Sequence, residues 1–388
     1  MSTIVALILL ILSIIFVPQF AEYKNLLLVG VAKLLGHYLL IDWLYKGLEE
    51  FKYVTDRTLF VKSLYVIAVF VFVRDSNDYE IYYLLQVLMV VVNMLFNVYY
   101  SRNFVSINIY KPNLSKFIKP FLILGLYQVL TSMYTSFNVA YLGFVTNPTE
   151  VGYYTTGTKL FILLLSVYTA FTGVMMPRMS SLIHSGNIDE FKKMVSKSCS
   201  SLMSFSIPIA IFCLIFSPDI VHLLSGDGYE GAYLPSRIIM PLIFIIGYEQ
   251  ILVIQILMPL KKDRDIFINS IVGALVGITC NFILVPIFMA VGSSIVWLLS
   301  EITVLLLSQY YVSKYIKYNF PTKELIRNLL VYLPLATLLM ILYYVYPNIS
   351  FSRISMGIVI LVLYFIVTTQ HPLRMSSFLT VLRQQVLH

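Results

Sequence analysis

The stretch VGYYTTGTKLFILLLSVYTAFTGVMMPRMS, residues 151–180, decides the fold of this chain. Its apolar run is long enough to cross a bilayer as a helix, which takes about 20 residues. One cation, Lys159, lies inside the run. Because an ionisable side chain within a span costs roughly 2.5 to 3.5 kcal/mol, it usually faces a cavity or a partner. Lys159 is therefore the first candidate functional residue. The alternative is a lysine about one turn from the outer boundary, whose ammonium group extends to the lipid headgroups.

Composition places the rest of the chain in lipid as well. Of the 388 residues, 59% are hydrophobic and 12% are charged, and the mean hydropathy is +0.85, which excludes an ordinary soluble protein. The net charge of +8 comes from small loop clusters rather than one basic stripe, so no nucleic-acid partner is expected. The three cysteines show neither zinc-ligand spacing nor a disulfide framework. No metal site and no cofactor are expected.

Twelve apolar runs are candidates for membrane-spanning helices. They are residues 3–20, 25–45, 60–73, 81–100, 120–142, 151–176, 200–216, 238–259, 266–289, 292–312, 325–346 and 354–369. The predicted fold class is therefore an all-α polytopic membrane protein with about 12 transmembrane helices.

The loops between these runs alternate in basic content. One set carries most of the lysines and arginines, whereas the opposite set carries only Lys24, Arg74, Arg237 and Arg353. By the positive-inside rule the first set is cytoplasmic, so both termini lie inside and the number of spans is even. The longest outward loop is residues 217–236, and the one soluble helix expected is the charged segment 187–198.

Several short motifs resemble one known family. The opening stretch contains GYY at 152–154, TKL at 158–160 and MPRMS at 176–180, and three further segments follow the family's order: WLYKGLEEFKY at 43–53, QILMPL at 255–260 and CNFILVP at 280–286. On these motifs the chain resembles the polysaccharide biosynthesis or O-antigen (Wzx-type) flippases of the multidrug/oligosaccharidyl-lipid/polysaccharide exporter superfamily. The matches run from about residue 43 to residue 301.

The resemblance implies a multidrug-exporter-like fold of two helical bundles. The segment 43–53 follows the second predicted span, whereas its counterpart in the family is expected after the fourth, so the first helical hairpin of the family is predicted to be absent. The expected domains are an amino-terminal bundle of about four spans in residues 1–117 and a carboxy-terminal bundle of six spans in residues 118–313. An additional hairpin and a cytoplasmic tail are expected in residues 314–388.

The resemblance also implies a transporter rather than an enzyme. It would move undecaprenyl-diphosphate-linked oligosaccharide units across the bacterial inner membrane by alternating access, for O-antigen, capsule or other surface polysaccharide assembly. Its expected partners are the lipid-linked oligosaccharide and membrane lipids, with a polysaccharide polymerase and a chain-length regulator as further candidates. Two alternatives remain: a multidrug or other lipid-precursor exporter of the same fold, and a membrane glycosyltransferase or O-antigen polymerase.

Polar residues inside the predicted spans are candidates for the substrate pathway. Lys33 and His37 are four residues apart, so they share one helical face and can meet an anionic substrate together with Lys159. The alternative for Lys33 and His37 is an interhelical hydrogen-bond pair. Gln128 and Asn138 are further candidates, suited either to sugar hydroxyls or to helix packing.

Two acidic residues, Glu249 and Glu301, fall near the middles of their predicted helices. Buried carboxylates are natural proton or sodium sites in a coupled transporter, and the alternative is a structural role. The resemblance further implies an Asp-Lys pair where this chain has Asn138 and Val139, so its coupling or substrate preference is expected to differ. No catalytic residue is expected.

Overall fold

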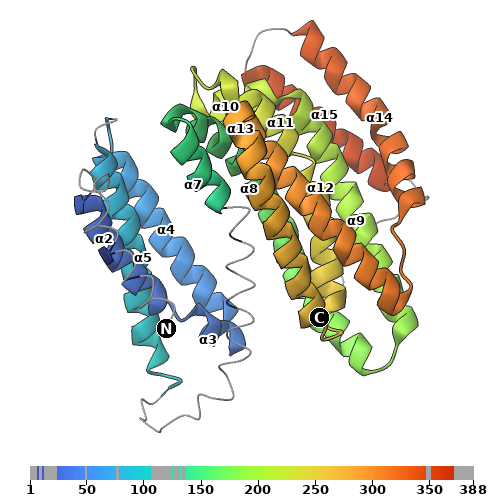
Figure 1. Cartoon of the computed structure of the whole chain (residues 1–388), viewed down its shortest axis with the longest axis horizontal. Helices are drawn as coiled ribbons and strands as arrows, with labels where there is room; N and C mark the ends of the chain where they lie inside the picture. Colours follow the sequence, from blue (N-terminus) through green and yellow to red (C-terminus); the bar gives the residue numbers. More distant parts are fainter. Residues whose placement is uncertain are drawn as a thin grey trace. The chain divides into compact units, whose positions relative to one another are not determined.

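The chain folds into helices and short turns, as the computed structural model shows. It describes residues 7, 11–12, 24–48, 50–75, 78–105, 125, 132, 136–346 and 351–370, and these contain no strand. The predicted all-α fold class is thereby confirmed. The chain divides into two compact units, residues 1–113 and 114–388, which are described separately (Figure 1).

The first unit consists of three long helices and one short helix within its described residues. They are α2 (Lys24–Tyr38), α3 (Asp42–Gly47), α4 (Phe51–Phe72) and α5 (Tyr79–Ser101). The central helix is α5, which packs against both α2 and α4 (Figure 1). At 22 residues α4 is about 33 Å long, so it extends the predicted run 60–73 into its amino-terminal flank, where Lys52, Asp56 and Arg57 make it less apolar than the described spans.

A buried polar network ties α3, α4 and α5 together. The Arg57 guanidinium donates to the Asp42 carboxylate at 3.0 Å and also to the Asn97 side-chain oxygen. The Asn97 amide in turn donates to Asp42 at 2.8 Å. Arg57 is only 7% exposed. This cation therefore holds the three helices together, besides counting among the basic residues of the more basic loop set.

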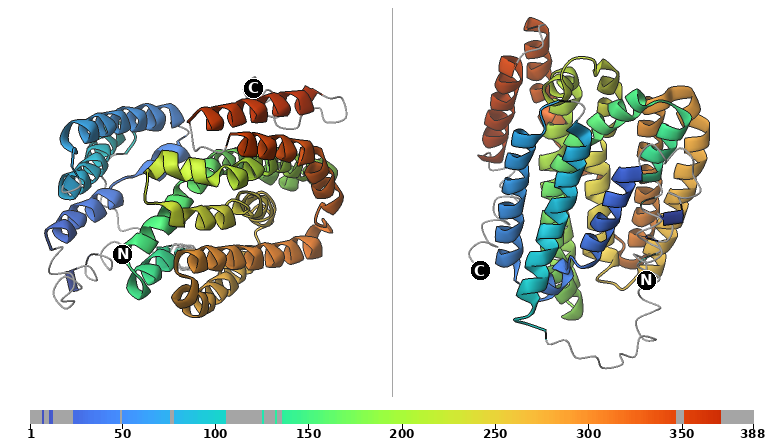
Figure 2. Two further views of the ribbon diagram at one scale, coloured as in Figure 1. Left: turned by 90° about the horizontal axis from the view of Figure 1, so that it is seen from above. Right: turned by 90° about the vertical axis from the view of Figure 1, so that its left-hand side faces the viewer.

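The second unit carries the remaining described helices. In order they are α7 (Ser136–Val145), α8 (Pro148–His184), α9 (Ile188–Ile215), α10 (Ser217–Ser225), the 3₁₀ turn η3 (Glu230–Ala232), α11 (Tyr233–Ile239), α12 (Leu242–Gln250), the π-helical η4 (Ile251–Leu257), α13 (Asp263–Ile316), α14 (Thr322–Val345) and α15 (Phe351–Gln370). The hairpin of α14 and α15 packs against α9 (Figure 2).

The longest helix, α13, contains two of the predicted spans. Its backbone leaves the helical region at Met289, with φ 50° and ψ −124°. Three residues later Gly292 lies against the backbone of the preceding segment, where an added Cβ would lie 2.5 Å from the Leu284 carbonyl oxygen. The chain therefore turns sharply between the predicted runs 266–289 and 292–312, and only glycine fits at position 292.

Two expectations for this unit are wrong. The charged segment 187–198 is not a separate soluble helix, because it forms the first part of the continuous 28-residue helix α9. The Asn187 side chain caps this helix by accepting a hydrogen bond from the Glu190 amide at 3.3 Å. The predicted loop 217–236 is largely helical, since it contains α10, η3 and the start of α11.

The outer surfaces of the helices are apolar. Large side chains such as Phe70 (81% exposed) and Phe144 (84% exposed) have no protein neighbours that cover them. Seven described helices are long and apolar enough to cross a membrane, and α13 is one of them. A protein with this exterior is stable only in lipid. The predicted number of 12 spans stays a prediction, because run 3–20 and most of run 120–142 lie outside the described residues.

Contacts at the ends of the helices agree with the two loop sets. The Glu150 carboxylate accepts a hydrogen bond from the Ala290 amide at 3.1 Å, which joins two loops of the less basic set. Tyr315 donates to Asp265 at 2.7 Å and lies 4.1 Å from the Lys262 ammonium group, all within the more basic set. In these contacts, groups of one set meet groups of the same set.

A buried ion pair attaches the α14–α15 hairpin to α10. The Arg353 guanidinium donates to the Asp219 carboxylate from Nε at 2.9 Å, and it also donates to the Tyr346 carbonyl. Both side chains are 1% exposed or less. Because neither charge reaches solvent, each depends on the other.

We expect Arg353→Met to lower the free energy of unfolding by about 3–5 kcal/mol, because it leaves the Asp219 carboxylate buried and unpaired. Thermal unfolding of the purified protein in detergent measures this. The matched control is His222→Gln, on the same helix as Asp219, which removes an exposed pair with Asp227 and should change little. If both variants lost the same free energy of unfolding, burial would not be the reason why the Arg353–Asp219 pair stabilises the protein.

Candidate functional site

Lys159 lies on the exposed side of α8. The helix begins at Pro148, where the Asn147 side chain accepts a hydrogen bond from the Glu150 amide at 3.0 Å. Nine residues separate Glu150 from Lys159, which corresponds to two and a half turns, or about 14 Å along the helix. Lys159 therefore lies deeper in the span than the single turn from the boundary at which its ammonium group would reach the lipid headgroups. This depth favours a polar surrounding, and the pathway role of Lys159 stays a prediction.

Other polar groups follow on the same side of α8. Ser166, which shares the helical face of Lys159, and Thr169 are both exposed. The Gln250 amide on α12 donates to the Thr169 hydroxyl at 3.0 Å. Exposed amides and hydroxyls are costly against hydrocarbon. We call Lys159, Ser166, Thr169 and Gln250 the polar face, although the exposed Ile162 and Leu163 lie between Lys159 and Ser166. These polar groups are the candidates in this unit for contact with a hydrophilic substrate.

The structure brings Glu249 and Glu301 together from α12 and α13. Their carboxyl groups lie close enough to interact electrostatically. Glu301 is 4% exposed, and one of its oxygens also accepts a hydrogen bond from the Trp297 indole at 3.0 Å. Two ionised carboxylates in contact would repel, so a proton or a cation between them is required for stability. Glu249 and Gln250 are neighbours on α12, so one helix carries both a member of the carboxyl pair and the amide that contacts Thr169.

Asn138 lies in a neighbouring polar cluster and is fully buried. Its amide donates to the Tyr154 hydroxyl at 3.1 Å and to the Ser293 carbonyl at 2.9 Å. These bonds join α7, α8 and α13. The contacts are those of a packing residue, and a direct role of Asn138 in the substrate pathway stays a prediction.

In the first unit, Lys33 and His37 lie on α2 and differ in their surroundings. The Lys33 ammonium group is half-buried, donates to the Gln86 carbonyl oxygen at 3.4 Å and lies 5.3 Å from the centre of the Tyr83 ring. His37, one turn later, is exposed. Both partners of Lys33 are neutral and come from α5, so the described contacts leave its positive charge without a counterion.

The sequence did not predict two residues that contact the candidate site residues, Trp297 and Gln86. Trp297 precedes Glu301 by four residues, a spacing that places both on one helical face and could have marked the pair. No sequence pattern indicated Gln86, because its contact with Lys33 depends on how α5 packs against α2. Gln128 lies outside the described residues.

The polar face and the carboxyl pair lie on a chain with recognisable relatives. The family described as "Polysaccharide biosynthesis protein" matches residues 1–183. Two curated proteins named "Putative O-antigen transporter" are similar to this chain. The one from Escherichia coli (strain K12) is 22% identical over 312 residues, which cover 80% of this chain and 75% of the relative. The one from Shigella dysenteriae is 25% identical over 278 residues, which cover 70% and 69%.

A solved structure shares the fold. It is described as "Lipid II flippase MurJ, inward closed conformation", and its TM-score is 0.75 over 100% of this chain and 83% of that chain. At 14% sequence identity this likeness shows the fold alone. The relatives are named as transporters and a flippase, which supports a transport protein rather than an enzyme. These findings agree with the resemblance that the motifs indicated: the chain is similar to proteins named as polysaccharide biosynthesis proteins and O-antigen transporters, and its apolar helices are those of a multi-pass membrane protein.

Proposed function

We propose that this transporter moves undecaprenyl-diphosphate-linked oligosaccharide units across the bacterial inner membrane, with both termini in the cytoplasm. One observation carries the proposal: the similarity to the two O-antigen transporters extends over 70% and 80% of the chain. The alternation of basic loops supports the orientation. The proposal includes a polysaccharide polymerase and a chain-length regulator as partners, because such proteins would act on the units after translocation.

In the proposed mechanism, alternating access exposes a polar pathway first to one side of the membrane and then to the other. A diphosphate needs cations, and its sugar chain needs hydroxyl and amide groups. Lys33 supplies a cation whose described contacts are weak and neutral, so little is lost when an anion replaces them. His37 lies one turn away, and Lys159 supplies an exposed cation two turns before Ser166 on the same side of α8. These groups match the chemistry of the substrate.

The carboxyl pair Glu249–Glu301 is the proposed coupling site. Its two acidic groups need a proton or a sodium ion between them, so binding and release of that ion change the interaction between α12 and α13. Within the described part of the chain, one oxygen of Glu301 is buried without a hydrogen-bond partner, which leaves it available to an ion. An ion gradient can therefore act on the helices that border the polar face.

The first prediction concerns the substrate class. Deleting the gene should remove surface polysaccharide and cause undecaprenyl-linked repeat units to accumulate on the inner leaflet, because their translocation stops. Extraction of lipid-linked intermediates and gel analysis of surface polysaccharide measure both effects. Restoration by a plasmid copy is the control. Normal polysaccharide in a strain with no second flippase would contradict the proposal and favour the export of drugs or of another lipid precursor.

The second prediction concerns Lys159. Lys159→Ala should lower export by about 10–100-fold, because it removes a charge-assisted hydrogen bond worth about 1.5–3 kcal/mol, whereas Lys159→Arg should retain most of it. Complementation of the deletion strain, normalised to protein amount, measures export. Asn138→Ala is the comparison: it should reduce the amount of folded protein through lost packing and leave export per molecule nearly unchanged. Parental export by Lys159→Ala would show that Lys159 only extends to the headgroups.

The third prediction concerns coupling. Glu249→Gln and Glu301→Gln keep hydrogen-bonding capacity but cannot release a proton, so transport should lose its dependence on an imposed ion gradient. Translocation of a fluorescent lipid-linked oligosaccharide into vesicles, with proton and sodium gradients imposed in turn, measures this. Glu324→Gln, on α14, is the matched control and should keep the parental response. Unchanged gradient dependence in both pair variants would exclude the pair as the coupling site.

A further inference from the structure

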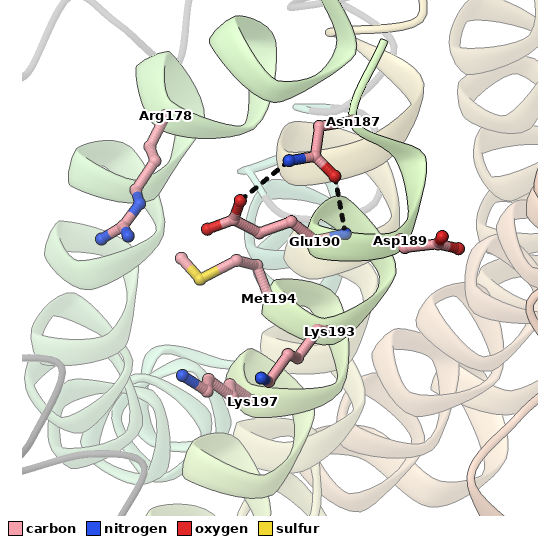
Figure 3. A pocket seen from close by; sticks show the side chains of 7 residues that line it. All are labelled: Arg178, Asn187, Asp189, Glu190, Lys193, Met194 and Lys197. Atoms are coloured by element: carbon pink, nitrogen blue, oxygen red, sulfur yellow. Dashed lines mark hydrogen bonds between the residues drawn. The ribbon is translucent and has the colours of Figure 1, made fainter. Parts of the chain in front are cut away.

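A polar pocket of about 580 Å³ lies where α8 ends and α9 begins (Figure 3). Arg178, on α8, provides one wall, and Lys193 and Lys197 on α9 provide the other. The two lysines are four residues apart, so they share one face of α9. Figure 3 shows the guanidinium and both ammonium groups directed toward the same space, with Met194 between them. Met194 is 4% exposed, so its side chain forms an apolar floor.

The three cations have no counterion within the described part of the chain. None of them takes part in the ion pairs found there, which involve Arg57, His222 and Arg353. Two carboxylates also line the pocket. The Glu190 carboxylate accepts a hydrogen bond from the Asn187 amide at 3.0 Å, and the Asp189 side chain is directed away from the three cations (Figure 3). With three cations and two carboxylates, the lining carries a net charge of +1 and favours an anion.

The position of the pocket along α8 indicates where that anion comes from. Twenty-eight residues separate Glu150 from Arg178, which is about 42 Å of helix. A bilayer is about 40–45 Å thick with its headgroups, so a helix that enters at Glu150 reaches the opposite headgroup layer at Arg178. The abundant anions at that depth are the phosphate groups of lipids, and arginine binds phosphate with two parallel hydrogen bonds.

We propose that this α8–α9 pocket binds the phosphate group of a lipid headgroup. Arg178 provides the bidentate contact, and Lys193 and Lys197 provide two point charges from the other side. The hydrogen bond from Asn187 orients the Glu190 carboxylate, which lowers the net positive charge of the pocket. The pocket is separate from the polar face of α8, and the proposal does not depend on which glycan is transported.

The test measures lipid binding by the purified full-length protein in a phosphate-free detergent. Dioctanoyl phosphatidic acid is the probe, dioctanoylglycerol is the matched lipid without phosphate, and native mass spectrometry reports the bound fraction. The parent should bind the phosphate lipid more tightly than the neutral one. Each lost cation should weaken binding about fivefold, so Arg178→Gln should lose about fivefold and the double variant Lys193→Gln/Lys197→Gln about thirtyfold.

Two control variants separate the pocket from general surface charge. Lys192→Gln removes an adjacent cation that does not line the pocket, and it should leave binding unchanged. Glu190→Gln should instead tighten binding about fivefold, because it removes the inward negative charge while its amide oxygen can still accept from Asn187. Asp189→Asn, which alters the outward carboxylate, should have little effect. A gain of binding in Glu190→Gln cannot arise from unfolding.

Three results would overturn the proposal: equal binding of the neutral lipid by the parent, equal losses in Lys192→Gln and the pocket variants, or inorganic phosphate binding as tightly as the lipid. Farnesyl diphosphate, measured in parallel, identifies the source of the phosphate. Preference for the diphosphate supports a site for a polyisoprenyl carrier, and equal binding supports a site for bulk phospholipid. These results stand whether or not the deletion strain loses surface polysaccharide, so the two proposals fail independently.

Discussion

The cost of placing charge in hydrocarbon decides where this chain keeps its ionisable groups. In the second unit, Arg353 and Asp219 are almost completely buried, and each is the counterion of the other. Glu301 is buried against Trp297 and Glu249. Where a counterion or a hydrogen-bond partner within the unit offsets this cost, the charged group contributes to packing. Lys159 has no counterion among the described ion pairs, so its depth along α8 favours a polar surrounding.

The sequence predicted the spans well because hydropathy records burial in lipid. The predicted run 151–176 falls inside α8, and the gap between runs 266–289 and 292–312 coincides with the turn at Met289. Hydropathy failed at residues 187–198, where a charged segment was expected to form its own helix. The Asn187 cap and the continuing backbone hydrogen bonds, rather than apolar character, make this segment the start of α9. Local hydrogen bonding is not visible in a hydropathy profile.

The site could be predicted only in part, because it depends on contacts between helices. Glu249 and Glu301 were each expected to be candidate ion sites, but their contact requires that α12 and α13 pack closely. Close packing of α12 is evident at Gly247, where an added Cβ would lie 2.4 Å from the Leu202 side chain on α9. Residue type predicted which groups could be functional. Their partners depend on interhelical packing, which a single sequence does not specify.

The geometry of α8 relates its two exposed cations. Lys159 and Arg178 are 19 residues apart, about 28 Å along one helix, so one lies within the span and the other at the headgroup layer. Pro177 lies directly before Arg178 and has no N–H group for the carbonyl of Gly173. Gly173 has no side chain and no neighbour within 4 Å of where a Cβ would lie, so the helix has room to bend there. Met175 and Met179, on either side of Pro177, are 1% and 0% exposed, so the buried face continues through this point and holds the helix against its neighbours. One packed helix therefore carries both cations, at two different depths.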